Sequence, residues 1–364
     1  MKIAAVETTV LTVRWGPASM NETRDWLIVR VRADNGLVGI GRHGAAGIIE
    51  KELKPLLMGQ DAGNIAGLWQ RMVDHVWRFR GPGASAMSSV CAIDIALWDL
   101  LGQAARLPVW RLLGGHSSTI PIYADGIGYE NEDADRMEEK VKLHADLGFD
   151  YVKIHLPGPD PDENVEKVRR SKEVLGPSKH LAVDVFRHWD GWTAARTVRR
   201  LLDYDLFWVE EPVRMNDEAG YLRMVRDMMI GTGTSCYLAA GEGEGTLAGV
   251  VRLITQGGVQ VIQTDLVAAG GYTGLMRVAT VCNAHNALFA PHGSQHPELN
   301  CHIAAAIPNH LMTPATPHIE PFQIWSHMYK PAFVATGGKI ALTEKPGLGL
   351  TLDEDFIRDH RKKA

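Results

Sequence analysis

Cysteine is scarce in this sequence, and the spacing of the few cysteines excludes several kinds of site. The 364 residues contain four of them, Cys91, Cys236, Cys282 and Cys301, and no two form a Cys-x-x-Cys pair. Such a chain is neither a disulfide-rich scaffold nor a cysteine-ligated zinc or redox protein. We expect the four thiols to be reduced and mostly buried.

Charge of one sign is also lacking, as are low-complexity tracts and long apolar runs. The formal net charge is −5 with scattered lysines and arginines, so no basic patch points to nucleic acid. No apolar run reaches membrane-spanning length, and the start, residues 1–7, lacks the apolar core of a signal peptide. These absences predict a soluble cytoplasmic protein without a nucleic-acid or membrane partner.

The first third of the chain has the patterns of an α+β domain. Alternating residues 26–32 and 37–41 flank the turn sequence Asp34-Asn35-Gly36, which predicts an antiparallel hairpin. Residues 88–102 then carry apolar positions at helical spacing, with a serine that can cap the start. Because 364 residues suffice for two domains, we place the first at 1–118.

From about residue 120 the pattern changes to short apolar runs separated by amphipathic helices. The runs are 120–124, 151–156, 181–185, 207–211, 237–242, 259–265, 287–292 and 318–320. Eight such runs are typical of a parallel βα barrel, and all but the first have ionisable residues at or near their C-terminal ends, where barrel active sites lie. An open doubly wound sheet is the alternative, but it would gather chemistry at one switch point.

Three acids would end successive strands of this barrel: Asp184, Glu210 and Glu242. Carboxylates brought together repel one another unless a cation lies among them, and three carboxylates suit Mg²⁺ better than zinc. The alternative for each acid is a helix cap or a surface ion pair. Glu211 competes with Glu210, but it points to the other face if the strand continues. We predict Glu210 as the ligand.

The following strands offer acid–base groups. Asp265 and His292 end neighbouring runs, and a carboxylate beside an imidazole makes a general base with its orienting partner. Lys153 and His155 share one strand face across the barrel mouth, where they can stabilise a substrate carboxylate or act as a second acid or base. Glu320, if protonated, can donate a hydrogen bond to an enediolate oxygen. Structural roles are the alternatives for each.

Together these parts indicate removal of a proton α to a carboxylate. That proton is very weakly acidic because its loss leaves two negative charges on one small fragment. The reaction therefore needs a cation at the carboxylate, a base on one face and hydrogen-bond donors around the enediolate. Reprotonation would then racemise the intermediate, loss of a β-hydroxide would dehydrate it, and a lactone oxygen as leaving group would open a ring.

The ordered set resembles the mandelate racemase subgroup of the enolase superfamily. Its members have acids on the third, fourth and fifth barrel strands, an Asp and a His on the sixth and seventh, a Glu on the eighth and Lys-x-Lys on the second. The resemblance extends to 89–99, 107–115, Ala269-Gly270-Gly271 and 346–349. It implies a modified (βα)7β TIM barrel at 119–322, Mg²⁺ as cofactor, and an α+β capping domain completed by 323–364. It also implies a homo-oligomer.

Two departures from the family pattern bear on the reaction. The second-strand motif reads Lys153-Ile154-His155, so a histidine stands where the family has its second lysine, which favours one-base elimination by His292 over two-base racemisation. Many relatives have Gly-x-Gly-Glu where this chain has Gly39-Ile40-Gly41-Arg42-His43. The family's two specificity loops would be about 15–25 and 41–47 here. Their candidates for binding an anionic substrate are Arg14, Arg24, Arg42 and His43, with ordinary surface charge as the alternative.

The sequence therefore predicts an enzyme, an acid-sugar dehydratase that forms a 2-keto-3-deoxy acid. Mg²⁺ on Asp184, Glu210 and Glu242 would bind the carboxylate, and His292 oriented by Asp265 would take the α-proton. The leaving hydroxide would receive a proton from His292 or His155. The rival reactions are epimerisation and lactone cycloisomerisation, and the rival class is a non-catalytic barrel with a structural metal.

Overall fold

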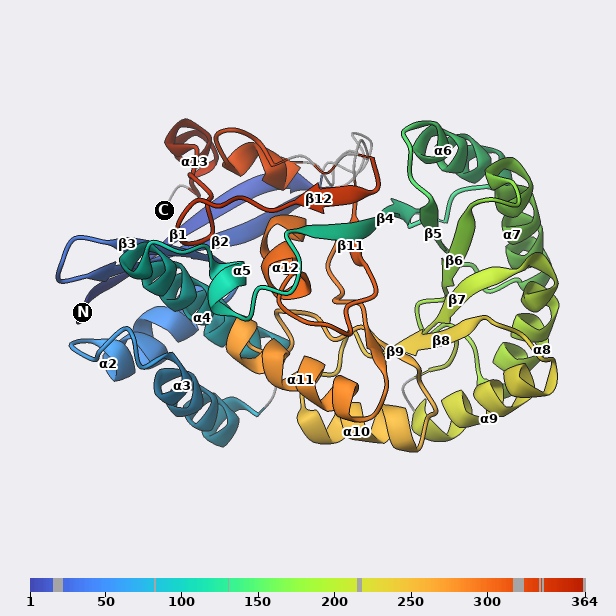
Figure 1. Cartoon of the computed structure of the whole chain (residues 1–364), viewed down its shortest axis with the longest axis horizontal. Helices are drawn as coiled ribbons and strands as arrows, with labels where there is room; N and C mark the ends of the chain where they lie inside the picture. The colour runs from blue at the N-terminus through green and yellow to red at the C-terminus, as the bar shows by residue number, and fades with distance from the viewer. Residues whose placement is uncertain are drawn as a thin grey trace.

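The structure is a computed structural model that describes residues 1–15, 22–81, 83–129, 131–214, 218–316, 324–333, 335 and 337–362. Within these ranges, the side chains of residues 14, 15, 22, 324 and 325 are not described. The fold has two parts: a sheet with helices that lies beside both termini, and a ring of parallel strands enclosed by helices (Figure 1).

The first part is built on an antiparallel sheet of β1 (Ile3–Trp15), β2 (Glu22–Ala33) and β3 (Val38–Arg42), in that order. The predicted hairpin is confirmed, because Arg32 pairs with Val38 across the turn at 34–36. Gly36 has a φ of 86°, which glycine adopts without steric cost.

Helices follow this sheet, and together with it we call them the cap. They are α1 (Ala46–Ile48), the π-helical η1 (Ile49–Leu53), α2 (Lys54–Leu57), α3 (Ile65–Arg80), α4 (Ala84–Ala105) and α5 (Val109–Leu112). The predicted helix 88–102 lies within α4, but the predicted serine cap is wrong. The helix begins one turn earlier after Gly83, and the hydroxyls of Ser88 and Ser89 donate to the carbonyl of Ser85 at 3.0 and 2.8 Å.

Helix α4 is the core helix of the cap, and two glycines let it approach β3 closely. A Cβ at Gly39 would lie 2.0 Å from the carbonyl oxygen of Ala96, and one at Gly41 would lie 1.8 Å from that of Ala92. Among the described helices, α4 alone is long and apolar enough to cross a membrane, but 72% of its apolar window is buried inside the protein. We therefore interpret its apolar composition as that of a core helix.

The second part is a parallel sheet in the order β10-β9-β8-β7-β6-β5-β4-β11. Its strands are β4 (Thr119–Ile127), β5 (Tyr151–His155), β6 (His180–Asp184), β7 (Leu206–Glu210), β8 (Tyr237–Ala240), β9 (Val261–Ile262), β10 (Leu288–Phe289) and β11 (Thr313–Ala315). The N–H of Leu311 donates to Phe289 at 2.8 Å and that of Phe289 to Asn309 at 2.9 Å, which joins β10 to the segment before β11 and closes the ring. The predicted parallel barrel is confirmed.

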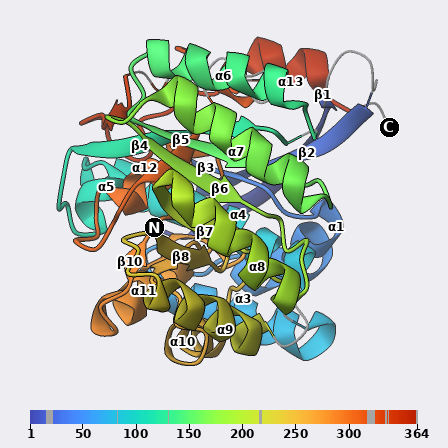
Figure 2. The same ribbon diagram turned by 90° about the vertical axis from the view of Figure 1, so that its right-hand side faces the viewer.

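Helices cover the outside of the ring (Figure 2). They are α6 (Ala134–Asp146), α7 (Pro161–Leu175), α8 (Gly191–Leu201) with the short η2 (Leu202–Tyr204), α9 (Glu218–Gly231), α10 (Leu247–Thr255), α11 (Tyr272–Ala284) and α12 (Pro297–Ala304). Inside the ring, side chains from successive strands, including Tyr123, Trp208 and Val261, form one buried cluster. The barrel is thus filled by side chains, as expected for this architecture.

The last barrel strand differs from the prediction. β11 pairs with β4 through Thr313 and Ile122, so residues 313–315 take the place that we assigned to the run 318–320. That run lies outside the described residues. The segment Thr313-Pro314-Ala315 has no apolar run and contains a proline, which is unusual within a sheet, so periodicity could not identify it.

The C-terminal segment returns from the barrel to the cap. It contains η3 (Ile324–Met328), β12 (Lys339–Ala341) and α13 (Glu354–His360). β12 pairs antiparallel with β4, and after α13 the N–H of Lys362 donates to Val10 of β1 at 2.9 Å. The C-terminus lies beside β1 and β2 in Figure 1. The exact domain boundaries at 118 and 322 stay predictions.

Candidate active site

The predicted site residues lie at one face of the barrel, at the carboxyl ends of its strands. His155, Asp184 and Glu210 are the last residues of β5, β6 and β7, and the strand register places His155 beside Asp184 and Asp184 beside Glu210. Glu242 follows β8 by two residues, and the residues Asp265 and His292 follow β9 and β10. The parallel sheet therefore gathers them, as the sequence predicts.

Asp265 and His292 form the expected pair. The imidazole Nδ1–H of His292 donates to Asp265 Oδ2 at 2.8 Å, and Nε2 lies 3.0 Å from Glu242 Oε2. Burial acts to lower the pKa of His292, but Glu242 and Asp265 raise that pKa to about 10. The N–H of Val267 donates to Asp265 Oδ1 at 2.5 Å and helps to fix the carboxylate. The imidazole is thus oriented on one side by Asp265, and its second nitrogen is held by Glu242.

Lys153 lies in the middle of a buried acidic group. Its Nζ is 3.0 Å from Glu210 Oε2, 3.5 Å from Asp184 Oδ2 and 3.7 Å from Asp125 Oδ1, and its side chain is 1% exposed. Burial raises the pKa of Glu210, and the neighbouring Asp184 raises it further, to about 7, against the effect of Lys153. The lysine thus supplies the cation that close carboxylates require.

His155 is held between two carboxylates. Its Nε2 lies 2.8 Å from Asp125 Oδ1 and its Nδ1 lies 3.2 Å from Asp184 Oδ2, while its ring stacks on Phe186 at 4.7 Å. Burial acts to lower the pKa of His155, but Asp125 and Asp184 raise that pKa to about 9. His155 and Lys153 thus share one strand face, as predicted, and both neutralise buried acids.

Glu210 and Glu211 point in different directions, as the alternation of a strand requires. Glu210 accepts hydrogen bonds from Lys153 and from Trp208 Nε1 at 3.1 Å, on the inside of the barrel. Glu211 instead pairs with Arg187 and accepts the N–H of Gly241 at 3.2 Å. The strand thus places Glu210, and not Glu211, inside the barrel beside Lys153, and the choice of Glu210 as a metal ligand stays a prediction.

The three candidate metal ligands do not surround one point in this structure. Among the described residues, no group of three His, Cys, Asp or Glu side chains is arranged to hold an ion. Glu242 faces His292 and lies 3.9 Å from Arg187, while Asp184 and Glu210 contact Lys153. The donor chemistry fits Mg²⁺, since these are carboxylate oxygens at three successive strand ends and Asp184 disfavours the charged form of Glu210. Glu242 would have to turn away from His292 to join them.

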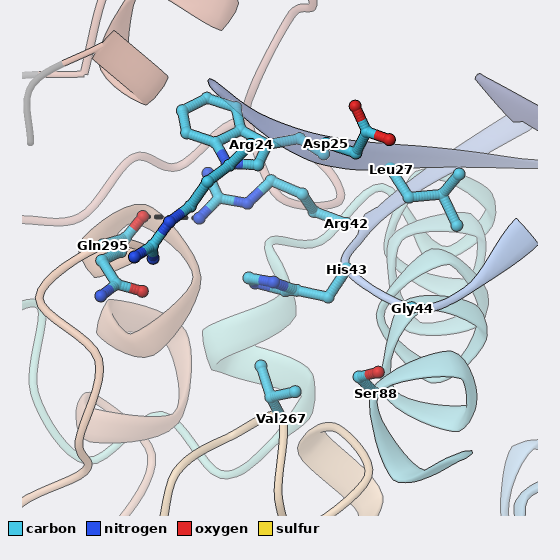
Figure 3. Close-up of a pocket in the computed structure, with 10 residues that line it drawn as sticks. Arg24, Asp25, Leu27, Arg42, His43, Gly44, Ser88, Val267 and Gln295 are labelled. Atoms are coloured by element: carbon cyan, nitrogen blue, oxygen red, sulfur yellow. Dashed lines mark hydrogen bonds between the residues drawn. The ribbon is translucent and has the colours of Figure 1, made fainter. Parts of the chain in front are cut away.

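Two cavities lie where the cap meets this end of the barrel. The larger, of about 620 Å³, is lined on the barrel side by Glu242, Asp265, His292 and His296 and on the cap side by His43, Trp77 and Met87. The smaller, of about 220 Å³, lies under β2 and β3 (Figure 3). Three residues, His43, Val267 and Gln295, line both cavities. The larger volume is in the range of small-molecule sites.

The cap residues that we predicted as substrate contacts have different positions. Arg24 and His43 line the smaller cavity. Arg42 lines it too, but its guanidinium pairs with Glu298 at 2.9 Å and donates to the carbonyl of Gln295 at 2.5 Å, as Figure 3 shows in part. The side chain of Arg14 lies outside the described residues. Their roles in substrate binding stay predictions, and Arg42 has a structural partner in addition.

Glu320 also lies outside the described residues, so its role stays a prediction.

Sequence reasoning missed two residues that the structure places at this end of the barrel. Asp125 is in β4, one residue beyond the run 120–124, so the first strand also carries an acid. His296 lies 3.8 Å from Asp265 through its Nε2. Extending the first run by one residue would have found Asp125, but nothing in the sequence distinguishes His296 from a structural histidine.

Comparisons with known proteins agree with this arrangement. Residues 136–356 match the family model described as enolase C-terminal domain-like, and residues 5–114 match that of the mandelate racemase / muconate lactonizing enzyme N-terminal domain. A solved racemase structure from Streptomyces coelicolor A3(2), with bound magnesium, superposes with a TM-score of 0.87 at 28% identity, covering 99% of this chain and 100% of that one.

Two of the similar proteins are named for reactions of sugar acids. A 3,6-anhydro-alpha-L-galactonate cycloisomerase from Streptomyces coelicolor is 34% identical over 90% of this chain and 89% of its own length. An L-talarate/galactarate dehydratase from Salmonella typhimurium is 26% identical over 91% of this chain and 81% of its own length. With family models matching both parts of the fold, the chain belongs to the mandelate racemase subgroup of the enolase superfamily.

Proposed function

We propose that this protein is a Mg²⁺-dependent enzyme that removes the α-proton of a sugar acid and eliminates the oxygen at the β-carbon, most simply as water. The observation that carries the proposal is the Asp265–His292 pair, at 2.8 Å, in the wall of the 620 Å³ cavity beside Glu242. The sugar-acid dehydratases and the cycloisomerase among the relatives support the substrate class.

Asp184, Glu210 and Glu242 would hold the metal. When bound, Mg²⁺ would neutralise the substrate carboxylate and so lower the cost of the second negative charge that develops on deprotonation. Lys153, at 3.0 Å from Glu210, would stay beside these acids and add positive charge next to the enediolate.

His292 would take the α-proton on Nε2, because Nδ1 is engaged by Asp265. Glu242 must first leave Nε2, which it contacts at 3.0 Å. The C–H electron pair then forms the C2–C3 double bond as the β-oxygen leaves with a proton from His292 or from His155. The resulting enol tautomerises to a 2-keto-3-deoxy acid.

A screen of sugar acids tests the proposal. The purified protein with Mg²⁺ is incubated with aldonates and aldarates of four to six carbons, and 2-keto acids are detected with semicarbazide. We expect signal from a small stereochemical subset and a loss of about 10²–10⁴-fold in rate for His292→Asn. The absence of any keto acid across the panel would refute elimination.

Cycloisomerisation of an anhydro sugar acid is the second candidate, and the relative that shares 34% identity with the chain favours it. A 3,6-anhydro acid carries an ether oxygen on its β-carbon, so the same proton removal would break that C–O bond and open the ring without loss of water. A product of unchanged mass from 3,6-anhydrogalactonate would support this candidate. Deuterium incorporation from solvent into recovered substrate, without keto acid, would instead indicate epimerisation.

A further inference from the structure

The boundary between the two cavities holds two histidines, one from each part of the fold. His43 follows β3 in the cap, and His296 precedes α12 in the barrel. Their rings lie edge to face with centroids 5.0 Å apart. His43 lines both cavities and His296 lines the larger one, together with His292 and Asp265. The pair thus faces the same space as the proposed base.

Both rings carry buried polar atoms that have no hydrogen-bond partner among the described residues. These atoms are Nε2 of His43 and both ring nitrogens of His296, and no group in the part of the chain that the structure describes bonds to them. The side chain of His296 is only 2% exposed. The contact from His296 Nε2 to Asp265 Oδ1, at 3.8 Å, is too long for a hydrogen bond. Buried polar groups are normally paired, so unpaired ones in the wall of a cavity indicate a ligand that pairs with them.

The backbone around both rings is arranged to hold them in place. His43 has a φ of 84°, uncommon for a residue with a side chain, and its N–H donates to Leu27 at 3.1 Å. A Cβ at Gly293, where φ is 107°, would lie 2.3 Å from His296 Nε2, so only glycine leaves room for that ring. Figure 3 shows His43 extending between Arg42 and Val267.

The chemistry of the pair favours hydroxyl groups. Burial lowers the pKa of His296 to about 4, and burial, Arg42 and His296 lower the pKa of His43. Both imidazoles are then neutral near pH 7, and each offers one N–H donor and one nitrogen acceptor. A sugar hydroxyl both donates and accepts, which matches such a ring better than a carboxylate does.

We propose that His43 and His296 form a specificity subsite that binds a hydroxyl on the polyol tail of the substrate, beyond the carbons that react. This inference rests on the proposed function for the direction in which the acid lies, with its carboxylate at the metal ligands and its α-carbon at His292. It adds that the substrate is an acid with hydroxyls beyond C3, and that one residue of the cap and one of the barrel bind the same hydroxyl.

Equilibrium binding to acids of increasing length tests the subsite. Glycerate has polar groups only on the carbons that react, whereas xylonate, arabinonate, gluconate and galactonate have further hydroxyls. Dissociation constants are measured by calorimetry with Mg²⁺, in a His292→Asn background so that no ligand is consumed. The variants are His296→Phe, which keeps the ring volume, and His43→Asn, since asparagine tolerates a positive φ. The control is His285→Phe, at the exposed C-terminal end of α11.

We expect each subsite variant to weaken binding of the best five- or six-carbon acid by about 10–100-fold, because it removes a hydrogen bond inside a desolvated site. Glycerate binding should change by less than about twofold. The double variant should lose less than the product of the two single losses, because both rings bind one hydroxyl. The His285 control should match the background protein with every acid.

If the variants weaken binding of glycerate and of the long acids equally, the effect is merely structural and the subsite is overturned. The subsite is also overturned if the variants do not weaken binding of the long acids, or if the protein binds no long acid. Keto acid formation by the wild-type protein is measured with the same panel. Tail-dependent binding without turnover would leave the subsite standing and refute the proposed function. Turnover of long acids that His296→Phe does not affect would support the proposed function and refute the subsite.

Discussion

At the scale of single residues, Lys153 is the group that lets several acids lie inside the barrel. Its Nζ is within 3.7 Å of Asp125, Asp184 and Glu210, and all four side chains are at most 5% exposed. Removing one partner from a buried charge cluster leaves the others uncompensated. The stability of the metal-free protein should therefore depend on this single ammonium group.

We expect Lys153→Met to lower the free energy of unfolding by about 3–5 kcal/mol in EDTA, measured by urea denaturation. Mg²⁺ should restore part of that loss, since a divalent cation would neutralise the same acids. The matched control is Lys142→Met, which breaks an exposed pair with Asp146 and should cost under about 1 kcal/mol. Losses of similar size in the two variants would contradict this account of the cluster.

The neighbouring acids Glu210 and Glu211 give a second prediction at this scale. Only Glu210 faces the interior beside Lys153, whereas Glu211 pairs with Arg187. Loss of a residue that only hydrogen-bonds to a metal ligand already weakens metal affinity by about 10–100-fold. Loss of a ligand itself, in Glu210→Gln, should therefore weaken Mg²⁺ binding by about 100-fold or more. Glu211→Gln should weaken it less, by about 10–100-fold at most. Calorimetric titration with Mg²⁺ measures both, and a reversed order would mean that Glu211 is the ligand.

The sequence predicts most of these residues because strand ends are readable from it. Asp184 and Glu210 end apolar runs, and parallel pairing then forces them side by side. It does not predict what each side chain contacts, since the 3.0 Å contact of Glu242 with His292 depends on a rotamer in a turn. The sequence also does not single out His296, because the ring that it contacts, that of His43, lies 5.0 Å away in a distant part of the chain.

At the scale of elements, the junction of α4 and α11 joins the cap to the barrel through a buried acid. Asp94 of α4 accepts the N–H of Thr273 at 3.0 Å and the hydroxyl of Thr273 at 2.6 Å. Gly271 precedes α11 with a φ of 100°, and a Cβ there would lie 2.4 Å from Asp94 Oδ2. Thus the helix start is shaped to receive this carboxyl group.

Burial raises the pKa of Asp94 to about 7, against the hydrogen bonds from Thr273. The folded state then binds more protons than the unfolded state between about pH 4 and 7, so stability falls as pH rises through that window. Compared with Asp94→Asn, which does not titrate, the wild type should lose about 1–3 kcal/mol of stability between pH 5 and 8. Urea denaturation at both pH values measures the difference.

The comparison cancels other titrating groups, including Asp99, whose pKa burial raises to about 6. A wild type that gains stability relative to Asp94→Asn over the same range would show that the carboxylate is favoured in the folded state. Parallel loss in both proteins would mean that Asp94 does not titrate in this window.

Helices and strands with a clear periodicity of apolar residues were predictable from the sequence, and very short strands were not. The hairpin of β2 and β3 and the helix within α4 follow from alternation and helical spacing. β9 and β10 have two residues each, and β11 contains Pro314, so pairing to neighbours, not local sequence, defines them. The start of α4 was misplaced because Ser88 and Ser89 bond back to Ser85 inside the helix instead of capping it.

At the scale of the whole molecule, a buried ion pair joins three distant segments next to the cavities. Arg42 of the cap lies 2.9 Å from Glu298 of α12, and the hydroxyl of Tyr329 from the C-terminal segment donates to the same carboxylate at 3.2 Å. The Arg42 and Glu298 side chains are 8% and 1% exposed. His43 is the next residue, so this pair also sets where the cap places its part of the subsite.

Removing either charge alone should destabilise the protein by about 3–5 kcal/mol, because the other stays buried and unpaired. Removing both should cost much less than the sum, since apolar side chains of similar size then fill the space. We therefore expect Arg42→Met and Glu298→Leu each to lower the urea midpoint strongly, and the double variant to recover most of the loss. Tyr329→Phe should cost about 1 kcal/mol, the net value of one hydrogen bond. If instead the single losses simply add, Arg42 and Glu298 contribute to stability independently of each other, and the ion pair does not join the segments.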